Sequence, residues 1–140
     1  MKKVMLFGTF DIIHAGHIHV FKEARKYGDY VVAVIARDKR IEDLKGFIPT
    51  HSEAERMEIL QQISLIDRVV LGDTQDVYKR ILEHRPDVIV LGYDQEHYTD
   101  QLGHALAEAG LHNTRTIRIK PYKNDTHKSG EIRKKLLGML

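Results

Sequence analysis

Residues 8–17 read Gly8-Thr9-Phe10-Asp11-Ile12-Ile13-His14-Ala15-Gly16-His17. The apolar run at residues 4–7 is typical of a buried strand, and residues 18–26 continue with the spacing of a helix. A glycine at a strand end permits a tight turn and close approach of the backbone to a ligand. The unpaired N–H groups at the start of a helix attract anions. The pattern therefore predicts a phosphate site between the strand and the helix.

Two histidines lie in this turn, three residues apart, on the same side of the first helical turn. Together with Asp11 they are compatible with a metal site, and a purely structural pair is a further alternative. Zinc usually takes a third or fourth protein ligand, and none is evident at a recognisable spacing. A Walker A loop would need a Gly-Lys-Ser/Thr sequence, which is absent here. We therefore interpret His14 and His17 as hydrogen-bond donors to phosphate and assign no metal ligands.

The segments Gly8-Thr9-Phe10-Asp11 and His14-Ala15-Gly16-His17 resemble the signature of the nucleotidylyltransferase superfamily, whose H-x-G-H motif stands in this context. The superfamily includes glycerol-3-phosphate cytidylyltransferase and archaeal-type FAD synthetase. The resemblance implies that a phosphate monoester attacks the α-phosphorus of a nucleoside triphosphate, ATP or CTP, and that pyrophosphate leaves. It also implies Mg²⁺ as the cofactor and a homodimer as the assembly.

The resemblance assigns roles to individual residues. His14 and His17 would donate to the transferring and leaving phosphates, and Lys45 would lie on the opposite side. Arg56 would contact the acceptor or a phosphate, although an ion pair within its own helix is the alternative. The nucleotide-binding residues implied by the first motif are Gly8, Thr9, Phe10, Asp11 and Gly16.

The rest of the chain alternates between strand and helix patterns. Strands are expected at residues 4–7, 30–36, 67–72, 87–91 and 114–120, and helices at 15–27, 52–63, 77–84, 101–110 and 131–137. In the charge run at residues 37–40, Lys39 and Arg40 are interpreted as part of a solvated loop. This order predicts an α/β fold, a Rossmann-like doubly wound five-stranded parallel sheet with helices on both faces.

The fourth predicted strand ends at Gly92, followed by Asp94. Ligands of open parallel sheets bind at the carboxyl ends of the strands, near the point where the strand order reverses. Residues 92–95 are therefore expected beside the turn at residues 8–17. The resemblance implies that Gly92 and Asp94 meet the ribose and base of the nucleotide, with a simple loop cap as the alternative for Asp94.

A polar loop at residues 121–130 occupies the position of the second superfamily signature, commonly R-T-x-G-I-S-T-T in glycerol-phosphate and phosphoethanolamine enzymes. This chain lacks the arginine and the Ile-Ser-Thr core. Ser129 stands where a helix N-cap would bind a phosphate. Lys123 or Lys128 would supply the positive charge.

Composition limits the other possibilities. We expect one domain, residues 1–140, because 140 residues suffice for one core. The absence of Cys excludes disulfides and thiolate ligands. A net charge of +2 does not indicate nucleic acid as a partner. The apolar run after Lys3 is too short for a signal peptide or a spanning helix, so we expect a cytoplasmic protein without a membrane partner.

The resemblance to archaeal-type FAD synthetases is closest at residues 35–38, 44–46 and 90–95. These enzymes adenylylate FMN, and the chain is therefore predicted to be an FMN adenylyltransferase. A CTP:glycerol-3-phosphate or phosphoethanolamine-type cytidylyltransferase is the alternative. A nucleotide-binding regulator without catalysis is an alternative of another class, since fold does not fix function.

Overall fold

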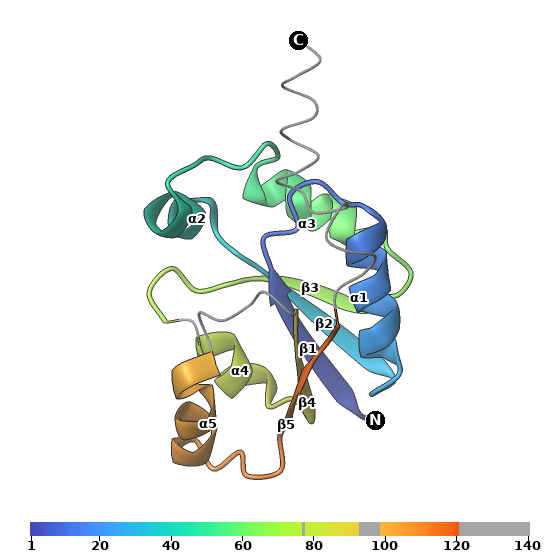
Figure 1. Ribbon diagram of the computed structural model, residues 1–140, viewed down its shortest axis with the longest axis vertical. Helices are drawn as coiled ribbons and strands as arrows, with labels where there is room; N and C mark the ends of the chain where they lie inside the picture. The colour runs from blue at the N-terminus through green and yellow to red at the C-terminus, as the bar shows by residue number, and fades with distance from the viewer. Residues whose placement is uncertain (77, 93–98, 121–140) are drawn as a thin grey trace.

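The computed structural model describes residues 1–76, 78–92 and 99–120. Five parallel strands form one sheet in the order β3-β2-β1-β4-β5 (Figure 1). The strands are β1 Lys3–Gly8, β2 Tyr30–Ile35, β3 Arg68–Leu71, β4 Val88–Leu91 and β5 Arg115–Arg118. This arrangement confirms the predicted fold class. The first strand lies at the centre of the sheet, and the third and last strands lie at its edges.

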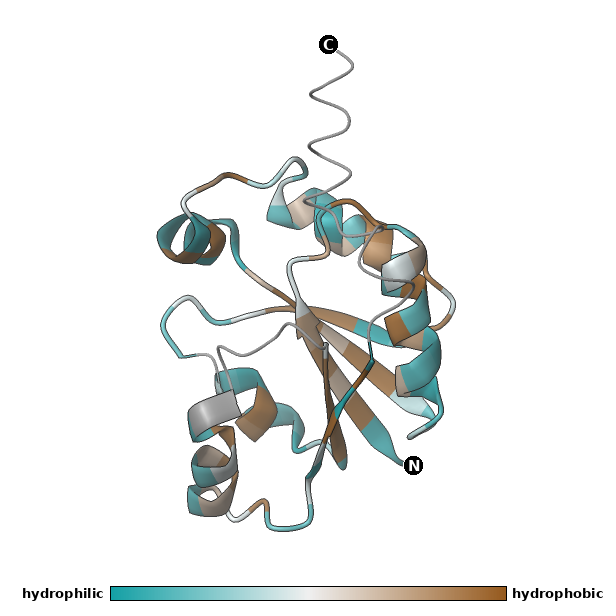
Figure 2. Ribbon diagram, viewed as in Figure 1, coloured by the Kyte–Doolittle hydropathy of each residue, from teal (hydrophilic) through white to brown (hydrophobic). Residues whose placement is uncertain are grey.

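Helices cover both faces of the sheet. They are α1 Ala15–Arg25, α2 Asp38–Lys45, α3 Glu53–Gln61, α4 Lys79–His84 and α5 Thr99–Glu108. One buried cluster joins the sheet to α1 and α3 through Phe21 and Leu60. The other joins it to α4 and α5 through Ile81 and Leu106. Figure 2 shows the strands mostly in the apolar colour, as expected when both faces of a parallel sheet are buried.

The alternation along β1 explains how one strand serves both cores. Val4 and Leu6 lie in the cluster with α1, whereas Met5 lies in the cluster with α5. Successive side chains of a strand point to opposite faces, so an uninterrupted apolar run is required at the centre of such a sheet. No helix in the described part of the chain combines the length and apolar character that crossing a membrane would require.

One predicted loop is a helix. Lys39 and Arg40, for which a solvated loop is predicted, lie in the first turn of α2. The helix is short and mostly polar and buries only Ile41, so little apolar sequence marks it as an element of the fold. It ends at Gly46, whose φ of 75° is the left-handed conformation that glycine adopts most easily. The predicted helix at residues 131–137 lies outside the described residues.

Aspartates fix the register of the strands at their amino ends. Each of three strands is preceded by an aspartate that forms two hydrogen bonds with one residue of the adjacent chain segment. The aspartate carboxylate accepts the N–H of that residue, and the aspartate N–H donates to its carbonyl. The carboxylate contacts are Asp29 with Lys2 (2.6 Å), Asp67 with Val31 (2.8 Å) and Asp87 with Lys3 (2.8 Å). A slip of one residue would break both bonds of a pair, so these contacts set the register.

The Asp29 contact predicts an acid-dependent loss of stability. The N–H of Lys2 holds the pKa of Asp29 below its ordinary value of about 4, so this group stabilises the fold above that pH and the contribution is lost as the pH falls through the folded-state pKa. We expect Asp29→Asn to lose less stability than wild type on acidification below about pH 4. Urea unfolding over that pH range measures the change in the free energy of unfolding. Glu58→Gln, on the exposed face of α3, is the control. Equal acid sensitivity of wild type and Asp29→Asn would contradict the assignment.

Candidate active site

The centre of the sheet marks the place for a ligand. From β1 the chain passes through α1 to β2 on one side, while β4 pairs with β1 on the other side. The turn after β1 therefore leaves the sheet at a topological switch point, where open α/β sheets bind ligands. α2 follows β2 almost directly, so its start lies at this same carboxyl edge (Figure 1).

The two histidines cap the helix that follows the turn. His14 is the N-cap of α1, and its Nδ1 accepts the N–H of Gly16 at 3.1 Å. His17 Nδ1 accepts the N–H of His14 at 3.2 Å, which completes a capping box. A ring nitrogen that accepts a hydrogen bond carries no proton, so each neutral imidazole holds its proton on Nε2. The helix cap thus makes both side chains Nε2–H donors.

The surroundings of His17 keep its imidazole uncharged. Burial, and next the neighbouring His14, lower the pKa of His17 to about 3, while Asp11 acts in the opposite direction. The two imidazole centroids are 4.0 Å apart, which makes a second positive charge unfavourable. The ring of Phe10 meets His17 edge-on at 5.7 Å between centroids. At neutral pH His17 is therefore a neutral donor.

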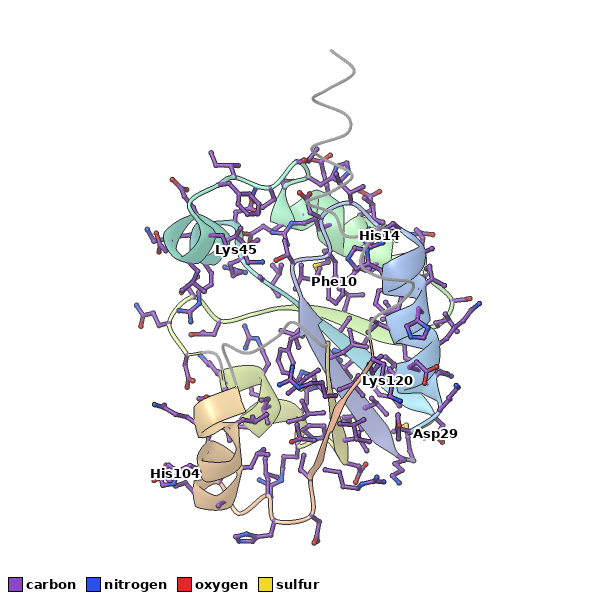
Figure 3. All side chains as sticks on the ribbon, in the orientation of Figure 1. Phe10, His14, Asp29, Lys45, His104 and Lys120 are labelled. Atoms are coloured by element: carbon purple, nitrogen blue, oxygen red, sulfur yellow. The ribbon has the colours of Figure 1, made fainter. Side chains whose placement is uncertain are left out.

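The glycine at the end of β1 makes room for a side chain of the same turn. A Cβ on Gly8 would lie 2.7 Å from Cζ of Phe10, because the ring folds back beneath the strand end. Phe10 itself has a φ of 52°, which non-glycine residues adopt rarely. Its ring is buried against Phe21 at 5.6 Å. The turn is thus held by an aromatic anchor, and Figure 3 labels Phe10 and His14 in this part of the molecule.

Two contacts bring the segment after β2 onto the turn. Lys45, in the last turn of α2, donates to Thr9 Oγ1 at 3.3 Å. The buried carboxylate of Asp11 accepts the N–H groups of Thr50 and His51, both at 2.8 Å. The structure therefore places the predicted lysine beside the predicted phosphate turn. Asp11 lies in this turn, and its carboxylate links the turn to the backbone of the loop before α3.

Arg56 is buried beneath the turn. Its side chain is 0% exposed and donates to Thr9 O, His51 O and the Asp38 carboxylate. Its ion-pair partner is thus on α2, and not in its own helix, which was the alternative to a contact with the acceptor or a phosphate. The contact with the acceptor or a phosphate stays a prediction.

The remaining predicted residues divide into two groups. Gly92 follows β4 directly, and β4 pairs with β1, so this glycine lies at the same edge as the turn. Its carbonyl accepts a hydrogen bond from Arg118 Nη1 at 2.9 Å, a contact that sequence analysis did not anticipate. Asp94, Lys123 and Ser129 lie outside the described residues. Among residues that are described, no group of three or more His, Asp or Glu side chains is arranged to hold a metal ion.

A parallel α/β sheet whose first turn carries a capped H-x-G-H pair, with a lysine across the turn, defines a nucleotidyltransferase. The chain belongs to the cytidylyltransferase-like family, which it matches over residues 5–135.

Individual relatives extend this similarity along the whole chain. The FAD synthase of Thermoplasma acidophilum is 38% identical over 140 residues, which cover 100% of this chain and 97% of the relative. The FAD synthase of Archaeoglobus profundus is 42% identical over 121 residues, covering 86% and 76%. A crystal structure from Thermoplasma volcanium, described as a lipopolysaccharide core biosynthesis protein, superposes with a TM-score of 0.82 at 38% identity and covers 88% of this chain and 99% of that one.

The Phe10 anchor predicts the effect of a methyl group at Gly8. We expect Gly8→Ala to lower the free energy of unfolding by about 1–3 kcal/mol, since the added Cβ must displace the Phe10 ring. Gly103→Ala in α5 is the matched control, because its Cβ would meet nothing within 4 Å. There the same exchange removes only the backbone freedom of glycine and should stabilise the helix. Denaturant unfolding of both variants tests this, and a Gly8→Ala variant as stable as Gly103→Ala would contradict it.

The low pKa of His17 predicts a second pH effect. In the unfolded chain the His17 imidazole has a pKa of about 6.5, whereas in the folded protein its pKa is about 3. Between these two values the unfolded state binds a proton that the folded state does not, so the free energy of unfolding falls as the pH drops. We expect His17→Gln to lose less stability than wild type between about pH 6.5 and about pH 4. The exposed His112 supplies the control variant, His112→Gln. Unfolding curves at each pH measure the difference, and equal losses in wild type and His17→Gln would refute the assignment.

Proposed function

We propose that this protein is an FMN adenylyltransferase, which transfers AMP from ATP to the phosphate of FMN and releases pyrophosphate. The observation that carries the proposal is the end-to-end similarity to FAD synthases, combined with the placement of the histidine pair and Lys45 around one turn. A phosphate monoester is already anionic near neutral pH, so the reaction needs no strong base and no covalent nucleophile. The demand on the protein is alignment and charge stabilisation.

Each group has a part that follows from its geometry. The Nε2–H groups of His14 and His17 donate to oxygens of the α- and β-phosphates, which gain charge as the bond to pyrophosphate breaks. Neutral donors suit this task because they are already oriented by the helix cap and need no reorganisation. Lys45 adds a full positive charge across the turn. The N–H groups at the start of α1 bind phosphate oxygens in the field of the helix dipole.

A divalent ion, which we propose to be Mg²⁺, fits this site as a companion of the nucleotide. Asp11 is occupied by backbone N–H groups, and the histidine Nδ1 atoms accept backbone N–H groups as well. Mg²⁺ usually keeps several waters and binds through substrate phosphates. Bound in that way, the ion would neutralise phosphate charge, while the described side chains position the triphosphate.

A cytidylyltransferase acting on glycerol 3-phosphate is the second candidate, favoured by the cytidylyltransferase-like family match. Both reactions use the same histidines and lysine, and they differ in the base and the acceptor. The homodimer expected by resemblance also stays a prediction, which light scattering after gel filtration would test. A regulator without catalysis is disfavoured by the fully formed histidine cap.

The proposal predicts pyrophosphate release from ATP and FMN in the presence of Mg²⁺. ATP or CTP is paired in turn with FMN, glycerol 3-phosphate or phosphoethanolamine, and FAD formation is followed by chromatography. Turnover of CTP with glycerol 3-phosphate would replace the proposal by the second candidate. Nucleotide binding without turnover in any pairing would support the regulator.

Single variants locate the reaction in this site. His14→Asn is expected to lower kcat about 10²- to 10³-fold, since it removes a donor to the developing charge. His112→Asn, an exposed histidine before β5, should keep the wild-type kcat. Equal activity of the two variants would place the chemistry elsewhere.

A further inference from the structure

Arg56 has the largest fully buried side chain in the described part of the fold. Removing a guanidinium from water is costly unless its donors are matched by acceptors of good geometry. Here Nη1 donates to Thr9 O at 2.7 Å, Nη2 to Asp38 Oδ1 at 2.6 Å and Nε to His51 O at 3.1 Å. All three nitrogens are used, so the burial is specific.

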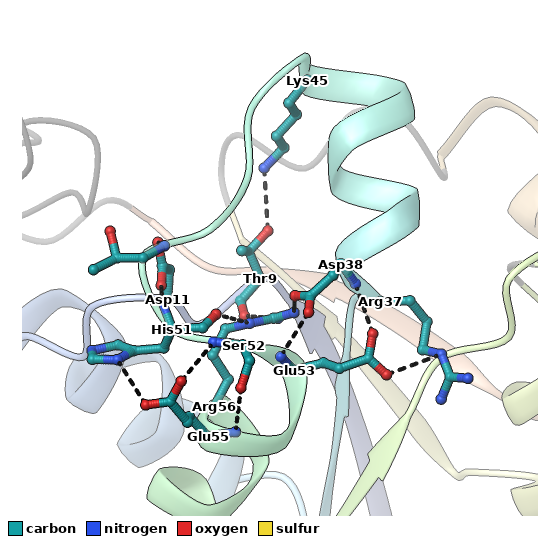
Figure 4. Close-up of polar contacts among 11 residues, drawn as sticks. Thr9, Asp11, Arg37, Asp38, Lys45, His51, Ser52, Glu53, Glu55 and Arg56 are labelled. Carbon is teal, nitrogen blue, oxygen red and sulfur yellow. Dashed lines mark hydrogen bonds and ion pairs between the residues drawn. The ribbon is translucent and has the colours of Figure 1, made fainter.

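These acceptors belong to three different segments (Figure 4). Thr9 lies in the phosphate turn, Asp38 is the first residue of α2, and His51 precedes α3. Asp38 is itself fixed, because it exchanges reciprocal bonds with Glu53: its N–H donates to Glu53 Oε1 at 3.0 Å, and it accepts the N–H of Glu53 at 3.1 Å. The guanidinium therefore ties the turn to the starts of both helices.

The segment held in this way carries Lys45. α2 begins at Asp38, where the guanidinium binds, and ends at Lys45, which reaches back to Thr9 Oγ1. The main-chain carbonyl of Thr9 is held by Arg56, and its hydroxyl accepts from Lys45. The distance between the turn at residues 8–17 and the lysine across it thus depends on one fully buried residue.

We infer that Arg56 is a positioning residue for nucleotidyl transfer, which holds Lys45 and the phosphate turn in the spacing that the reaction requires. A lysine cannot replace it, because a single ammonium group does not span three acceptors arranged as a planar fork. The inference rests on the nucleotidyl-transfer chemistry proposed above but not on the choice of ATP or FMN.

The test is the Arg56→Lys variant, assayed with whichever nucleotide and acceptor the wild type turns over. We expect kcat to fall about 100-fold, the loss that a misplacement of about 1 Å can cause, with KM for both substrates within about threefold of wild type. Arg25→Lys is the matched control. It alters another arginine–aspartate pair, Arg25 with Asp67, at the opposite edge of the sheet, and should keep the wild-type kcat.

A second readout separates positioning from stability. If Arg56 acts on the reaction through Lys45, its exchange should matter little once Lys45 is gone. In a Lys45→Ala background, Arg56→Lys should therefore lower kcat less than about threefold. If the two residues act independently, the two losses in kcat multiply. Multiplying effects, or an unchanged kcat in folded Arg56→Lys, would overturn the inference. A rise confined to the acceptor KM would instead make Arg56 an acceptor ligand.

Asp38→Asn keeps the test decisive should Arg56→Lys not fold. It removes the charge partner of Arg56 while retaining the shape of the side chain, and the same fall in kcat is expected. An unchanged kcat in Asp38→Asn would overturn the inference. Absence of wild-type activity with ATP and FMN would refute only the proposed substrates. The effect of Arg56→Lys is the ratio of variant to wild-type kcat, and it is measured with whichever nucleotide and acceptor the wild type turns over.

Discussion

The turn between β1 and α1 has to present backbone N–H groups to a ligand and still keep its shape. Backbone groups that face a ligand are not tied into the sheet or the helix, so side chains must hold the turn. Phe10 packs beneath it, the carboxylate of Asp11 binds the loop before α3, and Arg56 binds the carbonyl of Thr9. The strained φ of Phe10 persists because these contacts over-determine the conformation.

The same constraint explains the electrostatics of the site. A triphosphate brings several negative charges, yet two charged imidazoles 4.0 Å apart would repel each other before the ligand arrives. Burial keeps His17 neutral, and because the helix cap uses both Nδ1 atoms as acceptors, Nε2 is the nitrogen left on each ring to donate. The charge of Arg56 is matched by Asp38 inside the fold. Lys45, on the exposed end of α2, is then a cation that can meet phosphate directly.

The amino and carboxyl edges of the sheet carry different kinds of contacts. At the amino edge, carboxylates that precede the strands bind backbone N–H groups of their neighbours and set the register. Register is carried along each strand, so it also fixes which residues of β1 and β4 end side by side at the carboxyl edge. Figure 3 shows Asp29 and Lys45 at opposite ends of the molecule. The register contacts thus lie at the amino edge, whereas the turn with the two histidines and Lys45 lies at the carboxyl edge.

The sequence determined the fold class, the five parallel strands and the turn after β1, because apolar periodicity and the G-T-F-D and H-x-G-H segments are local patterns. It also indicated Lys45, through resemblance. Tertiary structure alone decided that Arg56 is buried, that residues 38–40 are helical and that Gly8 makes room for Phe10. For Arg56 the physical reason is that its partners lie far along the chain: the guanidinium contacts Asp38 and Thr9, 18 and 47 residues away, and no local pattern encodes such a contact.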